Sequence, residues 1–398
     1  MGQGRLVYCK NGDVAAELAA LGDRPAQVTG GPHHYIGTFL QWSEDQPVLL
    51  LSFNRHSGSH RTARARARTL HWGPRRNPLL GPFAKLRMFL TTAARILAFR
   101  PSWVLCAASG PPLWACYAAA RMLGVPFVHT RHGRFGGGSR RWNRQLETWL
   151  DGWVILHAHA VICHGPYLRE QLLALGVPRA RLLEFNLSYR YLDAHRAPRE
   201  APSDAGGRTV LFVGRLQKAK GVFDLLEAML PRLQADPRLR LVYAGGGPDL
   251  ARLRERAAAA PCARQIEVPG YVPHDRVPTL VREARVVVTP TRAELPESRC
   301  KAAIESLVLG RPVIAPDAGP FPYVVRHGDN GLLFREHDVA DLARQIGAAL
   351  DDEALYARLL EGARRAGAEL LDSSFNFRDA LEAAYARSAL ALPAPQTR

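Results

Sequence analysis

Residues 208–234, RTVLFVGRLQKAKGVFDLLEAMLPRLQ, contain a short apolar run, a turn bounded by Gly214 and Gly221, and a stretch with helical period. The same order returns in LRLVYAGGG (239–247) and DLARLRERAAAA (249–260). Apolar runs of strand length that alternate with amphipathic helices are typical of a parallel sheet covered by helices on both faces. The second half of the chain therefore predicts a doubly wound α/β domain.

The alternation extends over the rest of the chain. Further strands are expected at 266–272, 285–290, 312–316 and 331–334, with helices at 277–284 and 300–310. The first half repeats the pattern less cleanly, with strands near 5–9, 47–53, 103–108, 126–130 and 160–165 and helices at 113–123 and 166–175. Residues 101–120 carry no charge, but Ser109-Gly110-Pro111-Pro112 would break a membrane-spanning helix, so a strand, a turn and a packed helix are expected there.

Two Rossmann-like domains follow from this pattern. Residues 194–207, AHRAPREAPSDAGG, have no apolar period and are interpreted as a linker between a domain at 1–193 and a domain at 208–372. Residues 373–398 contain a helix expected to pack back towards the first domain. Doubly wound domains bind ligands outside the carboxyl ends of their strands, so we expect the two domains to face a central cleft.

The positive charge is concentrated in the first half. Residues 1–200 contain 26 Lys and Arg against 11 Asp and Glu, a net of +15, whereas residues 201–398 contain 27 against 25, a net of +2. No acidic residue lies between Asp45 and Glu147. We therefore expect the first half to face an anionic partner.

The cysteines and the N-terminal residues favour a cytoplasmic protein. The six cysteines are scattered and form no CxxC pair, which favours reduced thiols. The first ten residues, MGQGRLVYCK, have neither an apolar signal core nor a myristoylation motif.

Two cations beside a helix start suggest an anion site. Arg215 and Lys220 follow the strand that Gly214 closes, and the expected helix begins after Gly221. Helix N-terminal amides favour anions, so this turn predicts a diphosphate site; an ordinary solvated basic turn is the alternative. The glycines around Gly246 follow the next strand, where they allow either close approach of a ligand or a tight turn.

Two carboxylates lie beyond a later strand. Glu297 is expected in the loop after residues 285–290 or in the first helical turn, and Glu305 lies within the helix. Carboxylates accept paired hydrogen bonds from vicinal hydroxyls, which suits ribose or a hexose. The alternatives are that Glu297 is only a charge at the start of a helix and that Glu305 only faces solvent. Together with Arg215 and Lys220, the pair indicates a nucleotide diphosphate sugar.

Residues 208–345 resemble the donor-binding half of the retaining glycosyltransferases of family 4, which have the two-Rossmann GT-B fold. The matching pieces, in family order, are GRLQKAKG, AGGGP, GYV, PT, the Glu-x7-Glu pair, GRPVIAPDAGP and NGLLF. The resemblance implies that Arg215 and Lys220 hold the diphosphate, Glu305 the ribose and Glu297 the transferred sugar. It also implies transfer of a glycosyl group, typically a hexosyl group, without a metal or cofactor. The leaving phosphate would take the acceptor's proton on the same face, while the protein supplies position and charge.

Some positions depart from the family pattern. Ser298, Arg299, Cys300 and Lys301 replace the Gly-aromatic-Gly whose amides contact the donor sugar, so the sugar stays open. In the first half, FVHTRHGRFGGG (127–138) resembles the segment whose His or Asp faces the sugar; His132 is the match, and His129 fits less well. A core or loop histidine is the alternative. Gly30 and Gly31 resemble the glycine loop that approaches the donor phosphate.

A basic amphipathic stretch lies in the acid-free region. A helix over 83–99 would place Phe83, Leu86, Leu90, Ala94 and Leu97 near one face, with Lys85, Arg87 and Arg95 around it. Either this helix packs on its own domain, or it contacts an anionic membrane or a lipid diphosphate acceptor.

These observations favour a glycosyltransferase that acts on a polysaccharide precursor, a lipopolysaccharide or a glycolipid at the cytoplasmic membrane face. A nucleotide-sugar epimerase of the same fold and a non-catalytic sugar sensor are alternatives. A nucleic-acid-binding protein would explain the basic half, but no recognition module is evident and a sugar-nucleotide site would be superfluous. We therefore expect no nucleic acid partner.

Overall fold

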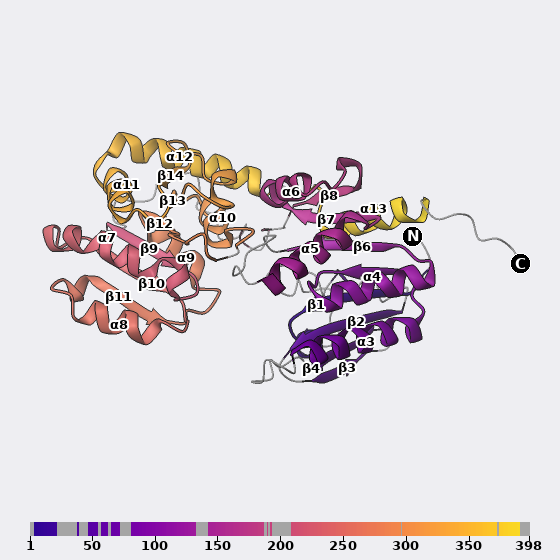
Figure 1. Ribbon diagram of the computed structural model, residues 1–398. Coiled ribbons are helices and arrows are strands. Elements are labelled where there is room, and N and C mark those ends of the chain that lie inside the picture. Colours follow the sequence, from indigo (N-terminus) through magenta and orange to yellow (C-terminus); the bar gives the residue numbers. More distant parts are fainter. Residues whose placement is uncertain are drawn as a thin grey trace, which may run out of the picture. The chain divides into compact units, whose positions relative to one another are not determined.

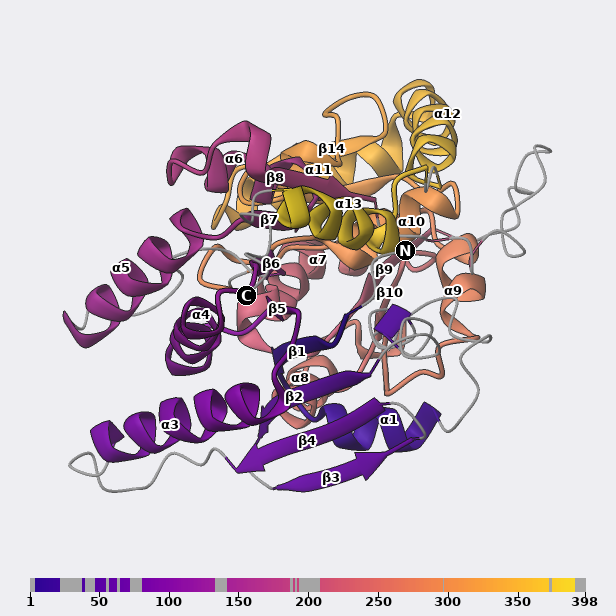
Figure 2. The same cartoon turned by 90° about the vertical axis from the view of Figure 1, so that its right-hand side faces the viewer.

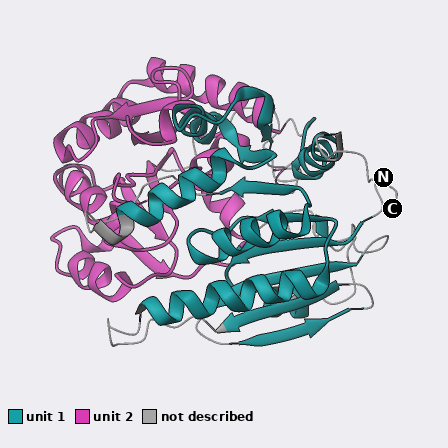
Figure 3. Ribbon diagram, turned by 45° about the vertical axis from the view of Figure 1, so that its right-hand side comes forward, with its two compact units in different colours: residues 1–187, 374–398 teal, residues 188–373 magenta. Residues whose placement is uncertain are grey.

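The computed structural model describes residues 4–21, 38–39, 47–54, 57–62, 65–71, 81–132, 142–186, 189, 192, 208–295, 297–371 and 374–390. Contacts divide the chain into two units, residues 1–187 with 374–398 and residues 188–373 (Figure 3). The expected linker, 194–207, lies outside the described residues.

The N-terminal unit is built on an eight-stranded sheet in the order β3-β4-β2-β1-β5-β6-β7-β8. The strands are β1 Leu6–Asn11, β2 Val48–Asn54, β3 Gly58–Arg61, β4 Ala65–His71, β5 Trp103–Cys106, β6 Phe127–Arg131, β7 Ala160–His164 and β8 Leu182–Phe185. All neighbours pair in parallel except β3 and β4. The helices are α1 Val14–Leu21, α3 Gly81–Phe99, α4 Pro111–Leu123, α5 Trp142–Leu156, α6 Gly165–Ala174 and α13 Phe377–Leu390.

Helices cover both faces of this sheet (Figures 1 and 2). The core on one face contains side chains of α3, α4, α5 and α6, and the core on the other contains side chains of α1 and α13. The last helix, α13, packs against β7 and β8 and buries Phe377, Ala380, Leu381 and Ala384 completely. The C-terminal segment is therefore part of the N-terminal unit's core.

The strand β4 and its partner β3 are not predicted by the apolar runs. In ARARTLH the buried positions Ala65 and Ala67 alternate with exposed Arg66 and Arg68. The period is that of a half-buried strand, but alanine gives a weak apolar signal, so the segment resembles a basic loop. The expected strand and helix across 101–120 are confirmed as β5 and α4, with a bend at Gly110 between them.

The C-terminal unit is built on a six-stranded, fully parallel sheet in the order β11-β10-β9-β12-β13-β14. The strands are β9 Thr209–Val213, β10 Arg240–Ala244, β11 Ile266–Gly270, β12 Val286–Val288, β13 Val313–Pro316 and β14 Gly331–Phe334. The helices are α7 Val222–Ala235, α8 Leu250–Ala258, α9 Val277–Glu283, α10 Lys301–Val308, α11 Val339–Asp351 and α12 Glu353–Leu370. This order is that of a Rossmann sheet, as the sequence predicts.

None of the helices in the described part of the chain combines the length and the apolarity that a membrane span requires.

Candidate functional site

A cavity of about 270 Å³ lies at the carboxyl edge of the C-terminal sheet. It is lined by residues after β9, residues after β12, and the first turns of α10. The strand order reverses between β9 and β12, because the chain continues from β9 to β10 on one side and reaches β12 on the other. Ligands of open α/β sheets bind at this switch point, so the cavity lies where the fold favours a ligand.

The two predicted cations line this cavity. Arg215 follows Gly214 at the end of β9, is exposed, and has no ion-pair partner among the residues the structure describes. Lys220 ends a short 3-10 turn, after which Gly221 adopts a φ of 70°. A Cβ atom at Gly221 would lie 1.9 Å from the carbonyl oxygen of Pro290. Glycine is therefore required for the turn that carries Lys220 to approach the loop after β12.

The two predicted carboxylates line the same cavity. Glu297 lies in the loop before α10 and accepts two hydrogen bonds from Nζ of Lys220, at 2.8 and 2.7 Å. Glu305 lies within α10, is only 8% exposed, and has an Oε1 3.3 Å from Nζ of Lys301. The four side chains predicted from distant segments are therefore brought together around one cavity.

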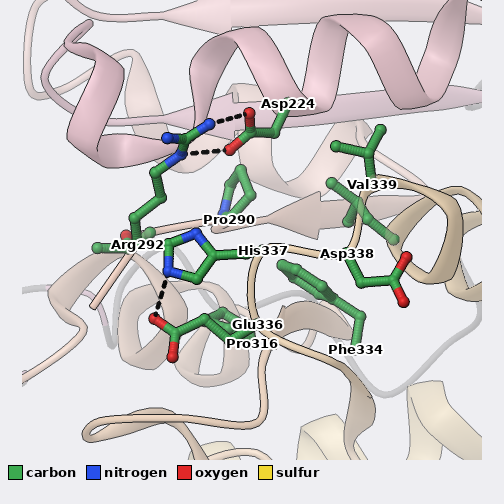
Figure 4. A pocket seen from close by; sticks show the side chains of 11 residues that line it. Asp224, Pro290, Arg292, Pro316, Phe334, Glu336, His337, Asp338 and Val339 are labelled. Carbon is green, nitrogen blue, oxygen red and sulfur yellow. Dashed lines mark hydrogen bonds and ion pairs between the residues drawn. The ribbon is translucent and has the colours of Figure 1, made fainter. Parts of the chain in front are cut away.

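A second, smaller cavity of about 10 Å³ shows how the loop after β12 is held in place (Figure 4). Its wall contains Arg292, which donates two hydrogen bonds to Asp224 of α7, at 2.7 and 2.6 Å. The Asp224 carboxylate raises the pKa of Arg292. The backbone N–H of Arg292 also donates to the carbonyl of Ala219. These contacts fix the loop after β12 against the turn that carries Lys220.

The glycines after β10 differ in their roles. Gly245 has a φ of 155°, and a Cβ atom there would lie 1.8 Å from the carbonyl oxygen of Gly214. Close packing of the two loops thus requires Gly245. A Cβ atom at Gly246 would have only the Cβ of Tyr271 within 4 Å, at 4.0 Å, so the space beside Gly246 is open. Gly214 itself lines the cavity.

The segment that departs from the family pattern divides in two. Cys300 and Lys301 line the cavity, and burial together with the Glu297 carboxylate raises the pKa of the Cys300 thiol to about 12. Ser298 and Arg299 are not among the lining residues. The Arg299 guanidinium instead lies 5.5 Å from the centre of the Tyr189 ring.

Sequence reasoning missed several of the lining residues, His274, Thr289 and Phe321 among them. His274 follows β11 and Thr289 follows β12. Their positions just beyond parallel strands are the signal that could have identified them.

In the N-terminal unit, His132 follows β6 and its Nε2 lies 3.1 Å from Oγ1 of Thr130. Burial, Lys10 and Arg131 lower its pKa to about 4, so the imidazole is neutral at pH 7. His129 lies within β6 and is completely buried. Gly30 and Gly31 lie outside the described residues. The described glycine directly after β1 is Gly12, with a φ of 117°; Lys10 and Asn11 separate it from the first apolar run, and sequence reasoning did not name it.

All six cysteines are free and buried. Among the residues described, the thiols of Cys9, Cys106 and Cys116 form a group with metal-ligand spacing, within 4.8 Å of one another. They belong to the apolar core of the N-terminal unit and do not line the switch-point cavity. That the glycosyl transfer needs no metal or cofactor stays a prediction.

Two family models match the chain. The model of glycosyl transferases group 1 matches residues 193–366, and the model of glycosyltransferase family 4 matches residues 44–183. The glycogen synthase of Mycobacterium tuberculosis is 28% identical over 255 residues, which cover 62% of this chain and 60% of that protein. The D-inositol 3-phosphate glycosyltransferase of Acidothermus cellulolyticus is 36% identical over 184 residues, covering 44% of this chain and 40% of that protein. The chain thus matches less than two thirds of the length of these relatives.

Solved structures share the fold over almost the whole chain. The HepE protein of Anabaena, solved with UDP, has a TM-score of 0.67 at 17% identity, covering 96% of this chain and 99% of that one. Sucrose-phosphate synthase of Thermosynechococcus elongatus has a TM-score of 0.66 at 20% identity, covering 98% and 99%. The α/β GT-B fold expected from the sequence is confirmed. With both halves matched by models of the same kind of enzyme, the chain belongs to glycosyltransferase family 4.

Proposed function

We propose that the protein transfers a glycosyl group from a nucleotide diphosphate sugar to an acceptor, with retention of configuration. The observation that carries this proposal is the shared cavity at the switch point, which two cations and two carboxylates from distant segments line. The solved complexes of HepE with UDP and with UDP-glucose support a nucleotide sugar as the donor.

The charges around the cavity suit the parts of such a donor. Arg215 and Lys220 are proposed to bind the diphosphate. The helix after Gly221, α7, contributes no lining residue, so we propose that the N-terminal amides of α10, whose first residues line the cavity, assist them. Glu305 would accept hydrogen bonds from the ribose and Glu297 from the transferred sugar. In the structure Lys220 pairs with Glu297. A bound diphosphate would offer Lys220 a second anion, leaving carboxylate lone pairs of Glu297 for sugar hydroxyls.

The remaining predicted contacts are secondary. Gly214, Cys300 and Lys301 line the cavity and are proposed to contact the donor. Gly246 is proposed to leave room for it, because the space beside this residue is open. For Ser298 and Arg299 a direct donor contact is not proposed.

The chemistry needs charge stabilisation more than a protein base. As the glycosidic bond breaks, negative charge grows on the leaving phosphate, which takes the acceptor's proton on the same face. Arg215 and Lys220 would stabilise that charge, and one such preorganised donor typically contributes about 10²–10³-fold in rate. His132 is proposed to contact the transferred sugar as a neutral imidazole, since its pKa is lowered to about 4.

For the acceptor we propose a polysaccharide precursor, a lipopolysaccharide or a glycolipid at the cytoplasmic face of the membrane. The relatives named glycogen synthase and D-inositol 3-phosphate glycosyltransferase, and a solved lipopolysaccharide galactosyltransferase, support a glycan or polyol acceptor. The basic, acid-free stretch of the N-terminal unit supports an anionic environment.

A thermal-shift screen of UDP-, GDP- and ADP-sugars tests the donor site. A bound donor stabilises the fold by mass action, by about 2.7 kcal/mol at a hundredfold excess over Kd. We expect one donor class to raise the melting temperature of the wild type, and Glu305→Gln or Arg215→Ala to abolish the rise. Glu255→Gln, on the exposed side of α8, is the control and should keep it. An equal shift in all four proteins would contradict the proposal.

A further inference from the structure

The helix α3 exposes an apolar stripe. Its inner side buries Met88, Thr92 and Ile96. Its outer side exposes three large apolar side chains, Phe83 at 70%, Leu86 at 55% and Leu90 at 55%. Their spacing of three and four residues places them on one helix face. Single exposed apolar residues are ordinary, but a continuous stripe indicates a binding surface.

The helix α5 exposes a second stripe with the same spacing. Leu146 is 50% exposed, Trp149 63% and Trp153 42%, while Val154 and Ile155 are buried in the core beneath. Tryptophan combines a large apolar ring with a polar N–H group and is enriched where apolar and aqueous phases meet. An exposed aromatic stripe therefore favours an interfacial partner.

The two stripes lie on the same side of the N-terminal unit. Both helices pack against α4, and all three cover the same face of the sheet (Figure 2). An ion pair between Lys85 of α3 and Glu147 of α5 joins the two helices near their N-terminal ends. We call the six exposed side chains the docking surface: Phe83, Leu86, Leu90, Leu146, Trp149 and Trp153.

Arginines surround the α3 side of this surface. Arg66 and Arg68 of β4 and Arg87 of α3 are exposed, and Arg95 of α3 is half-buried. Burial lowers the pKa of Arg95, and the nearby guanidinium of Arg68 lowers it further. In the described part of the chain these four arginines have no acidic partner. The apolar stripes therefore lie in a field of uncompensated positive charge.

We propose that the docking surface binds an anionic lipid bilayer, with the aromatic and leucine side chains at the boundary between headgroups and acyl chains and the arginines at the headgroups. The apolar stripes match the acyl-chain region of such a bilayer, and the arginines beside them match its anionic headgroups. A nucleic acid would match the arginines but leave the stripes exposed. A second copy of the chain would match the stripes but oppose like charges. Binding to a bilayer would bring the enzyme to a lipid-linked acceptor. In that respect the inference rests on the proposed function.

Flotation of the full chain with vesicles tests the proposal. We expect stronger binding to vesicles of phosphatidylcholine mixed with phosphatidylglycerol than to phosphatidylcholine alone, weakened by salt and accompanied by a blue shift of tryptophan emission. Replacing Phe83, Leu86 and Leu90 together by serine should weaken binding on the order of a hundredfold. Arg66→Gln and Arg87→Gln should each weaken it roughly fivefold. For a single-residue match, Leu90→Ser should weaken binding, whereas Leu173→Ser, on α6 outside the docking surface and 38% exposed, should not.

Three results would overturn it. The first is that the wild type does not bind vesicles, and the second is that the triple-serine variant binds them as well as the wild type does. The third is that the same residues are required for self-association or for retention on DNA, but not for binding to vesicles. The thermal shift with nucleotide sugars separates this inference from the proposed function. Variants of the docking surface should keep the donor-induced rise in melting temperature. A wild type that binds vesicles but no nucleotide sugar would contradict the proposed function without contradicting the docking surface.

Discussion

At the residue scale, two neighbouring lysines differ in their surroundings. Lys220 lines the switch-point cavity and pairs with Glu297, whereas Lys218 of the same 3-10 turn is exposed and not among the lining residues. Both carry the same charge on the same short segment. Position alone therefore separates a proposed phosphate ligand from a solvated cation.

Lys220→Ala should reduce sugar transfer about 10²–10³-fold, because one charged donor to the leaving diphosphate is lost. Lys218→Ala should stay close to the wild-type rate. Initial rates with the donor identified by thermal shift would measure both, with circular dichroism to verify the fold. Equal losses in the two variants would mean that general surface charge, and not the cavity, accounts for the effect.

A buried carboxylate in α5 also has an unusual setting. Oδ1 of Asp151 accepts hydrogen bonds from the backbone N–H of Gly110 at 2.9 Å and from Nε1 of Trp114 at 2.8 Å, at the start of α4. Burial raises the pKa of Asp151 from 3.8 to about 6, even though these donors and Arg131 oppose the shift. Between these two values the folded state holds a proton that the unfolded state has released.

The stability of the N-terminal unit should therefore depend on pH through Asp151. The contribution of the protonated carboxyl is fully present below pH 3.8 and is lost as pH rises through about 6. The amide of Asp151→Asn can accept the same two hydrogen bonds without titrating. Urea unfolding should show the difference in unfolding free energy between the two proteins changing by up to about 3 kcal/mol across this window. Parallel pH curves would contradict the assignment.

At the scale of elements, the site depends on the interlocking of two loops. The loops after β9 and β10 are joined by the N–H of Gly214 to the carbonyl of Ala244 and by the N–H of Leu216 to the carbonyl of Gly246. Gly245 lies so close to Gly214 that no side chain fits. The loop that carries Arg215 is therefore positioned by the neighbouring strand's loop.

Gly245→Ala should destabilise the C-terminal unit by about 2 kcal/mol or more, since it adds both a clash and a strained φ. Gly246→Ala, next in the chain, should cost less than about 1 kcal/mol, because the space beside it is open. Denaturant unfolding of both variants measures the difference. Should Gly246→Ala lose donor binding while its stability is preserved, the proposed donor role of Gly246 is supported; similar stabilities for the two variants would count against the loop packing.

At the scale of the whole molecule, the last helix completes the first unit. The Phe377 ring of α13 is fully buried and lies 5.1 Å from the ring of Phe185 and 6.0 Å from that of Phe39. Residues more than 180 positions apart in sequence thus share one core.

Phe377→Ala should cost about 3–5 kcal/mol of stability, the usual result of deleting a buried aromatic side chain. The loss should fall on the N-terminal unit, so the donor-induced thermal shift of the C-terminal unit should persist. Limited proteolysis with and without donor would locate the change. Faster cleavage within 208–371 instead would argue that the helix supports the other unit.

The local pattern of residues was sufficient for many of the strands and helices and for the four candidate site residues. Runs of four to six apolar residues, glycines after strands and charged residues at helix starts are short-range features. The strands of the C-terminal unit and its helices from α7 to α10 could therefore be predicted, with the four residues Arg215, Lys220, Glu297 and Glu305, whereas α11 and α12 were not. The strands β3 and β4 could not, because alanine and arginine alternate there without a strong apolar signal.

Long-range packing settled the rest. The strand order that brings β9 beside β12, the contact of Gly221 with Pro290, and the exclusion of Ser298 and Arg299 from the cavity walls depend on which segments meet in space. The same holds for the helix stripe at Phe83, Leu86 and Leu90, for which the sequence left packing and exposure equally open. Periodicity specifies that a face is apolar, but only burial by neighbouring elements determines whether that face is core or surface.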